Sequence, residues 1–294
     1  RTVVGGLVAA ALPLAATSAT ETPSPPGVQS GSRSSAPAHL AASPPAPFAT
    51  QPWDVHGRVD AGAYAVERVR FDSGGTEVVG NLFLPQGGGR RAAVVLIGPV
   101  AYVKEQAPLQ YASRLAREGL VALIFDPRFH GESGGQPRRL ESRLARVADL
   151  RAALDCLARR SEVDAGQLHV VGLCQGVNWA AEAAADDPRV RSLALAAGHY
   201  LMPETAALYL GGPAAVAARL ARAQQARERF ERTGEVEYVP IVSLTDPDAL
   251  LTARPIHDFY YRWVDRGPFA AHTGLWENRI ARMSELDIWG HRVE

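Results

Sequence analysis

Apolar and polar positions alternate along residues 64–85 in two runs that predict β-strands. The first run is YAVERVRF (64–71) and the second is EVVGNLFLP (77–85). The turn-forming sequence Asp72-Ser73-Gly74-Gly75 separates them. Two strand-forming runs joined by a glycine-rich turn are typical of a β-hairpin.

Four short, continuous apolar runs follow the hairpin. They are AAVVLIG (92–98), LVALIFD (120–126), LHVVGL (168–173) and VRSLALAAG (190–198). Such runs are typical of strands buried on both faces. Segments of helical periodicity lie between them, at residues 107–118 and 140–157. Strands that alternate with helices predict an α/β fold with a doubly wound, mostly parallel sheet, in which functional residues follow the carboxyl ends of the strands.

The pattern changes to helical after Gly198. An apolar stripe formed by Val216, Leu220, Ala223 and Phe230 predicts one helix, and a second helix is expected from Pro255 and a third over residues 276–286. One short strand is expected at residues 238–244. We therefore predict a core domain at residues 53–202 and a helical cap at residues 203–294. Three aromatic residues of the second helix are candidate pocket residues, namely Tyr260, Tyr261 and Trp263.

The first residues carry the features of an export signal. Arg1 precedes an apolar run that ends at Ala16, and small residues suit cleavage after Ala19. The run is shorter than the roughly 20 apolar residues of a membrane span. We expect a signal peptide at residues 1–19, with Arg1 as the second half of a twin-arginine pair, and an exported protein; a buried N-terminal helix is the alternative. Residues 20–52, rich in Pro, Ser and Ala, predict a disordered linker.

The composition and the spacing of residues argue against nucleic-acid binding and against a zinc site. The 294 residues contain 31 Lys and Arg and 31 Asp and Glu, so no net charge favours binding to nucleic acid. The two cysteines lie on a predicted helix and at the end of a predicted strand, and we expect both to be free thiols. The sequence has no His, Cys and Asp spacing typical of a zinc site. We expect neither a metal nor an organic cofactor.

The segment Gly172-Leu173-Cys174-Gln175-Gly176 joins a predicted strand to a predicted alanine-rich helix. Glycine two residues before and after a nucleophile is typical of the elbow that holds it on a tight strand-to-helix turn. The start of the helix favours negative charge, and we expect it to lower the pKa of the Cys174 thiol. The alternative is that Cys174 is a small buried hydrophobic residue.

Three motifs in this order resemble the dienelactone-hydrolase-related branch of the α/β-hydrolases. They are LIGP (96–99) followed by VKEQ (103–106), FDPRFHGESGG (125–135) and VDAGQLHVVGLCQG (163–176). The resemblance covers residues 64–198, and some members of that branch have a cysteine nucleophile. It implies an α/β-hydrolase fold in which Cys174 is the nucleophile and the N–H groups of Gln175 and Val100 form the oxyanion hole.

The resemblance also implies an acid after the seventh strand and a histidine after the eighth. One candidate strand (residues 238–244) precedes Asp246, but no later strand that delivers a histidine is recognisable before Glu294. We therefore assign residues 203–294 to the cap and expect both strands of the family to follow the end of this sequence. The alternative is a compact triad that Asp246 and His291 complete. His130 and His199 follow predicted strands, and His199 is a further candidate pocket residue.

These observations predict an exported hydrolase that binds a small acyl substrate. Cys174 would attack the carbonyl group of an ester, thioester or lactone and form an acyl-enzyme. A binding module without a working base and an acyltransferase are the alternatives. The sequence leaves the identity of the substrate and the oligomeric state open.

Overall fold

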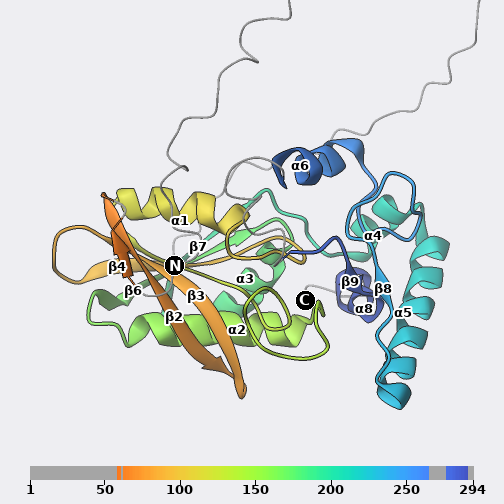
Figure 1. The fold of residues 1–294 in the computed structure, drawn as a ribbon, viewed down its shortest axis with the longest axis horizontal. Helices are drawn as coiled ribbons and strands as arrows, with labels where there is room; N and C mark the ends of the chain where they lie inside the picture. Colours follow the sequence, from red (N-terminus) through yellow and green to blue (C-terminus); the bar gives the residue numbers. More distant parts are fainter. Residues whose placement is uncertain (1–57, 61, 265–275, 291–294) are drawn as a thin grey trace, which may run out of the picture.

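The computed structural model describes residues 58–60, 62–264 and 276–290, and its central feature is a seven-stranded sheet (Figure 1). The strands are β1 (Arg58–Asp60), β2 (Tyr64–Ser73), β3 (Thr76–Pro85), β4 (Arg91–Ile97), β5 (Val121–Phe125), β6 (Val163–Leu173) and β7 (Val190–Ala196). Their order in the sheet is β1-β2-β3-β5-β4-β6-β7.

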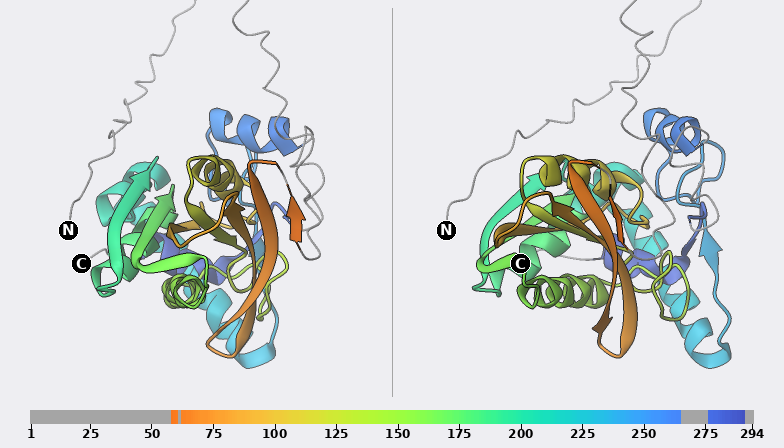
Figure 2. Two further views of the ribbon diagram at one scale, coloured as in Figure 1. Left: turned by 90° about the vertical axis from the view of Figure 1, so that its left-hand side faces the viewer. Right: turned by 60° about the vertical axis from the view of Figure 1, so that its left-hand side comes forward.

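Strands β5, β4, β6 and β7 are parallel neighbours, as the continuous apolar runs predict. The hairpin of β2 and β3 is also confirmed, and β3 pairs antiparallel with β5. Strand β2 therefore runs in the same direction as the parallel strands, and only β1 and β3 run against them. Both views of Figure 2 place the hairpin and β7 on opposite sides of the sheet, and β1 forms the edge next to the hairpin.

Helices cover both faces of the sheet, which confirms the doubly wound α/β fold. Val94 and Leu96 of β4 pack in one apolar cluster with α1 (Ala107–Arg117). Val95 and Ile97 point to the other face, where the second cluster contains residues of α2 (Arg143–Ala158) and α3 (Gly176–Ala185). Successive side chains of a strand point to opposite faces, so one strand supplies both clusters.

A C-terminal segment, residues 203–264 and 276–290, packs against the loops that follow the strands. Val100 and Ala101, after β4, share an apolar cluster with Ile241, Ile280 and Trp289 of this segment. Its elements are α4 (Pro203–Leu210), α5 (Pro213–Thr233), β8 (Tyr238–Val239), α6 (Arg254–Val264), β9 (Ile280–Ala281), a 3₁₀ turn (Arg282–Ser284) and α8 (Glu285–Trp289). Helix α5 matches the predicted apolar stripe and ends at Gly234, whose φ of 74° suits a glycine cap.

Two predictions for this segment are wrong. The strand expected at residues 238–244 is limited to β8, which pairs with β9 in a separate two-stranded sheet. Pro240 has no N–H to continue the pairing. The side-chain amide of Asn278 instead binds both the N–H and the carbonyl of Val242, each at 2.8 Å. The α-helix expected over residues 276–286 begins only at Glu285, because β9 and the 3₁₀ turn occupy residues 280–284 and residues 276–279 are irregular.

The predicted signal peptide (1–19), the linker (20–52) and His291 lie outside the described residues. In the part of the chain that the structure describes, every helix is too short or too polar to cross a lipid bilayer.

Candidate active site

Cys174 lies on a sharp turn between β6 and α3, as the glycine spacing predicts. Its φ is 54°, in the left-handed region that non-glycine residues adopt only where the surroundings enforce it. A Cβ atom on Gly172 would lie 2.8 Å from the Cα of Val177. A Cβ atom on Gly176 would lie 2.4 Å from the carbonyl oxygen of Gly98. Both glycines are therefore required for helix α3 to pass this close to β6 and to the loop after β4.

The expected lowering of the thiol pKa is wrong. Cys174 is partly accessible to solvent, but protein atoms surround its sulfur on most sides. This burial raises the pKa of the Cys174 thiol, because a thiolate loses water solvation there. The N–H of Gln175 hydrogen bonds to the sulfur and lowers the pKa, but by less. Both cysteines are free thiols, as expected.

The loop after β4 (residues 98–102) approaches the elbow and carries the second candidate oxyanion donor. The N–H of Ala101 donates a 2.6 Å hydrogen bond to Oε1 of Glu141, so this donor is occupied. Among the described residues, the N–H of Val100 has no acceptor. The candidate donors for an oxyanion at this position are thus the N–H of Val100, which has no acceptor in the described part of the chain, and the N–H of Gln175, whose present acceptor is the Cys174 sulfur.

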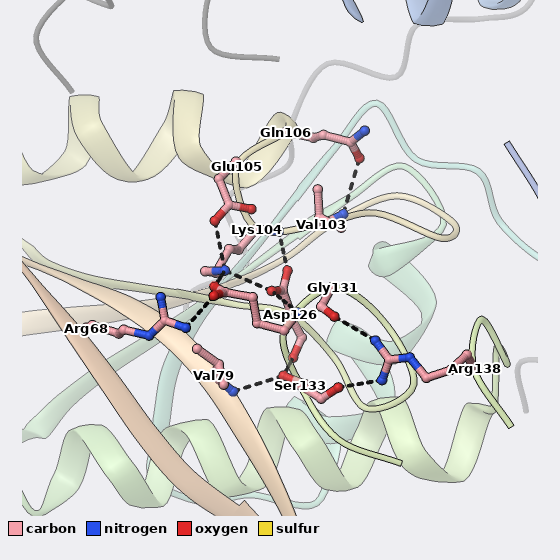
Figure 3. Close-up of polar contacts among 11 residues, drawn as sticks. Arg68, Val79, Val103, Lys104, Glu105, Gln106, Asp126, Gly131, Ser133 and Arg138 are labelled. Atoms are coloured by element: carbon pink, nitrogen blue, oxygen red, sulfur yellow. Dashed lines mark hydrogen bonds and ion pairs between the residues drawn. The ribbon is translucent and has the colours of Figure 1, made fainter. Parts of the chain in front are cut away.

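A buried ion-pair network holds this loop in place (Figure 3). Asp126, at the end of β5, accepts a 2.7 Å hydrogen bond from the N–H of Lys104 and a 2.8 Å hydrogen bond from its Nζ. The same carboxylate accepts a 3.0 Å hydrogen bond from the N–H of Glu132. The motifs VKEQ and FDPRFHGESGG therefore meet in three dimensions and fix the loop after β4 to the loop after β5.

The network contains more carboxylates than its buried ammonium group can satisfy. Lys104 Nζ also pairs with Glu105 at 2.8 Å and with Glu132, which in turn pairs with Arg68. Burial is the main cause that raises the pKa of Glu105 to about 7, and the negative charge of Asp126 adds to it. The sequence contained a signal for this cluster, since Asp126 directly follows a continuous apolar strand and the charged pair Lys104-Glu105 lies in the connection after another.

The histidines of the described residues do not hydrogen bond to the Cys174 thiol. The N–H of His199 donates a 3.1 Å hydrogen bond to the carbonyl oxygen of Cys174. Its ring packs on Tyr209 at 4.7 Å between centroids, and burial lowers its pKa. His130 is buried beside Glu141, with 3.9 Å between Nε2 and Oε1. His199 therefore adjoins the elbow through its backbone.

Of the predicted pocket aromatics, Tyr260 has contacts at the site. It stacks on Trp276 at 5.2 Å between ring centroids and packs in the cluster that contains Val100. Burial first, then the charges of Cys174 and Glu141, raise its pKa.

The other residues predicted for the site have different positions. Tyr261 is exposed and stacks on His257 at 4.5 Å between centroids. The side chain of Trp263 lies outside the described part of the structure. Asp246 accepts a 2.8 Å hydrogen bond from the N–H of Asp248, so its carboxylate stabilises a turn. The described residues include no group of three His, Cys, Asp or Glu side chains placed to hold a metal ion.

Comparisons with known proteins identify a family and several similar proteins. A family model described as serine aminopeptidase, S33, matches residues 89–273. The uncharacterized protein PA2218 of Pseudomonas aeruginosa is 36% identical over 146 residues, which are 49% of this chain and 39% of that protein. Its crystal structure matches with a TM-score of 0.69 and 27% identity, covering 83% of this chain and 76% of that one.

Two fungal proteins are also similar. Polyketide transferase claH of Penicillium crustosum is 34% identical over 128 residues, 42% of each chain. The crystal structure of the α/β-hydrolase GrgF from Penicillium sp. sh18 matches with a TM-score of 0.63 and 23% identity, covering 78% of this chain and 74% of that one. This likeness confirms the α/β-hydrolase fold. The sequence alignments with PA2218 and claH span about two fifths of the length of each of those proteins.

The raised pKa of Cys174 predicts its reactivity toward iodoacetamide. Because only the thiolate reacts, the alkylation rate of Cys174 should rise with pH and reach half its maximum above the ordinary thiol pKa of about 8.5. Mass spectrometry of the two cysteine peptides over a series of pH values would measure this. A midpoint below that value would mean that the start of α3 outweighs burial.

The raised pKa of Glu105 predicts a pH-dependent stability. Below about pH 4.3 the Glu105 carboxyl is protonated in both the folded and the unfolded protein. Between that pH and the pKa of Glu105 in the folded protein, only the folded protein keeps the proton. Stability should therefore fall as pH rises through this window, by up to about 3 kcal/mol. Glu105→Gln should remove this slope in urea unfolding, whereas Glu118→Gln, exposed at the end of α1, should keep it. A wild-type slope in Glu105→Gln would assign the proton to another group.

Proposed function

The chain belongs to the family described as serine aminopeptidase, S33, and from this premise we propose that it cleaves an ester, thioester or lactone through an acyl-enzyme on Cys174. The strained turn between β6 and α3 is the observation that carries the proposal. Cys174 has a φ of 54° there, and the close approach of Gly176 to Gly98 admits no larger side chain. A backbone held in this way is expected where it presents a reactive side chain. The family description specifies serine, whereas this elbow carries cysteine.

The reaction would begin with attack of the Cys174 sulfur on the carbonyl carbon of the substrate. The negative charge on the carbonyl oxygen would be stabilised by the N–H groups of Val100 and Gln175. Collapse of this intermediate would release an alcohol or a thiol, which takes up the thiol proton, and water would then cleave the acyl-enzyme.

Esters and thioesters are easier to cleave through a thiol nucleophile than amides. An amine leaves only after a general acid has protonated it, and histidine is the usual donor. Alcohols and thiols leave more readily. We therefore propose a carboxylic ester or thioester, including cyclic esters, as the substrate class.

Acyl transfer is a second candidate function. It is supported by the 34% identity to a protein named polyketide transferase. Water is a weak nucleophile, and its activation by a base typically contributes about 10²–10⁴ in rate. An alcohol or amine of a second substrate would then compete with water for the acyl-enzyme.

The test is acylation of the full chain by a p-nitrophenyl ester. We expect a burst of about one nitrophenolate per chain, followed by slower release, because acylation needs only the thiolate and release needs activated water. Mass spectrometry should locate the acyl group on Cys174.

Two variants make this test specific. Cys174→Ala should lose the burst, whereas Cys156→Ala, a second free thiol on α2, should retain it. A burst that survives Cys174→Ala would contradict the assigned nucleophile. Absence of any acylation in the wild-type chain would favour a binding module with a hydrolase fold. Faster release on addition of an alcohol, with formation of a new ester, would favour the transferase.

We also propose that the protein is exported, because residues 1–19 have the composition of a signal peptide. Expressed from its native gene, the protein should be recovered outside the cytoplasm with an N-terminus near Thr20. N-terminal sequencing of the recovered protein measures this. Recovery only from the cytoplasm, with Arg1 retained, would contradict export.

A further inference from the structure

The loop after β4 has a strained backbone next to the second candidate oxyanion donor. Ala101 has a φ of 52°, in the left-handed region that an alanine adopts only where its surroundings enforce it. Its N–H donates a 2.6 Å hydrogen bond to Oε1 of Glu141, a residue outside the loop. Because Ala101 directly follows Val100, this hydrogen bond fixes the peptide group that adjoins the N–H of Val100.

Glu141 is itself held from two other parts of the fold. Its side chain is buried, and Arg146 of α2 binds both oxygen atoms of its carboxylate, with 2.7 Å between Arg146 Nε and Glu141 Oε2. The N–H of Glu141 donates a 2.9 Å hydrogen bond to Oγ of Ser284, in the 3₁₀ turn of the C-terminal segment. Paired hydrogen bonds between a planar guanidinium group and a carboxylate fix the orientation of both groups. The acceptor of the Ala101 N–H therefore has little freedom to move.

Arg146 contacts the same loop at a second point. Its guanidinium group lies over the ring of Tyr102, with 5.6 Å between Cζ and the ring centroid. Tyr102 in turn packs against Gly98, where a Cβ atom would lie 2.6 Å from the ring. The ion pair of Glu141 and Arg146 thus supports the loop on both sides of Val100, through Gly98 before it and Ala101 after it.

The pairing also offsets the charge of Glu141. An unpaired carboxylate in buried surroundings would repel the negative charge that develops on the carbonyl oxygen of a substrate. Arg146 is as buried as Glu141, each being 2% exposed, so water screens neither charge and each offsets the other. Glu141 can therefore accept the hydrogen bond from Ala101 without opposing an oxyanion bound at Val100.

We propose that Glu141 is a positioning residue for the oxyanion hole. It binds the N–H of Ala101 and so fixes the loop in the conformation that leaves the N–H of Val100 for the oxyanion, while Arg146 holds the carboxylate in place. Glu141 acts through the loop and is not assigned a contact with the substrate. The effect on acylation rests on the proposed function of Cys174, whereas the hold on the loop does not.

Two double variants of the full chain separate the hydrogen bond from the ion pair. Glu141→Gln with Arg146→Met (the glutamine variant) keeps a side-chain oxygen for the N–H of Ala101. Glu141→Leu with Arg146→Met (the leucine variant) removes it. Both variants lack the buried ion pair, and replacing such a pair by uncharged groups of similar volume is often neutral for stability. Circular dichroism and thermal unfolding of both variants check that they fold.

Two reactions of Cys174 then distinguish positioning from a general structural role. The burst of nitrophenolate from a p-nitrophenyl ester should be about 10² slower in the leucine variant than in the glutamine variant, because an oxyanion-hole donor is displaced. Alkylation by iodoacetamide forms no oxyanion, so its rate should be the same in both variants. Equal burst rates in the two variants would overturn the proposal. A parallel loss of both reactions in the leucine variant would also overturn it, because it would assign Glu141 to the fold alone.

Amide hydrogen exchange of Ala101, followed by NMR, tests the hold on the loop independently of the proposed function. The N–H of Ala101 should exchange slowly in the wild-type chain and in the glutamine variant, and at least about tenfold faster in the leucine variant, which lacks the acceptor. A wild-type chain that shows no burst would contradict the proposed function, and the exchange rates would still decide the role of Glu141. Rapid exchange of Ala101 in the folded wild-type chain would overturn the proposal without any variant.

Discussion

The close approach of helix α3 to the loop after β4 is the constraint on which the candidate active site depends. A Cβ atom on Gly176 would lie 2.4 Å from the carbonyl oxygen of Gly98 and 2.8 Å from that of Ile97. Because no side chain separates these segments, the N–H of Gln175 and the loop that carries Val100 lie at the same edge of the sheet. Glycine at position 176 is thus a condition for the oxyanion hole and for the elbow together.

The ion pairs of Lys104 stabilise this arrangement from the opposite side of the loop. Asp126 binds both the N–H and the ammonium group of Lys104, so one carboxylate fixes the backbone and the side chain. Breaking a buried ion pair leaves an unpaired charge in a medium that solvates it poorly. The pairing therefore resists movement of the loop, and it explains why VKEQ and FDPRFHGESGG occur in one sequence.

The sequence predicted what local pattern determines. Continuous apolar runs such as AAVVLIG identified the buried strands, and the spacing of Gly172 and Gly176 identified the elbow. The predictions from the sequence failed where side chains distant in the sequence determine the local structure or the pKa of a group. The amide of Asn278 replaces a strand partner at Val242, and the packing around Cys174 reverses the expected direction of its pKa. Neither effect could be predicted from neighbours in the sequence, because each depends on which segments meet in space.

Burial is the common cause of the raised pKa values of Cys174 and Tyr260, and it affects the chemistry of the site. Burial raises the pKa of both Cys174 and Tyr260, so the thiol and the phenol, which are neutral at pH 7 in water as well, stay neutral to a higher pH in the described part of the site. Charge then appears only as a substrate reacts. In surroundings with little water, the fixed N–H groups of Val100 and Gln175 interact strongly with a developing oxyanion, because no solvent competes for it. The packing that makes the resting thiol less reactive therefore also favours the tetrahedral intermediate over the free enzyme, and substrates whose leaving group accepts the thiol proton benefit most.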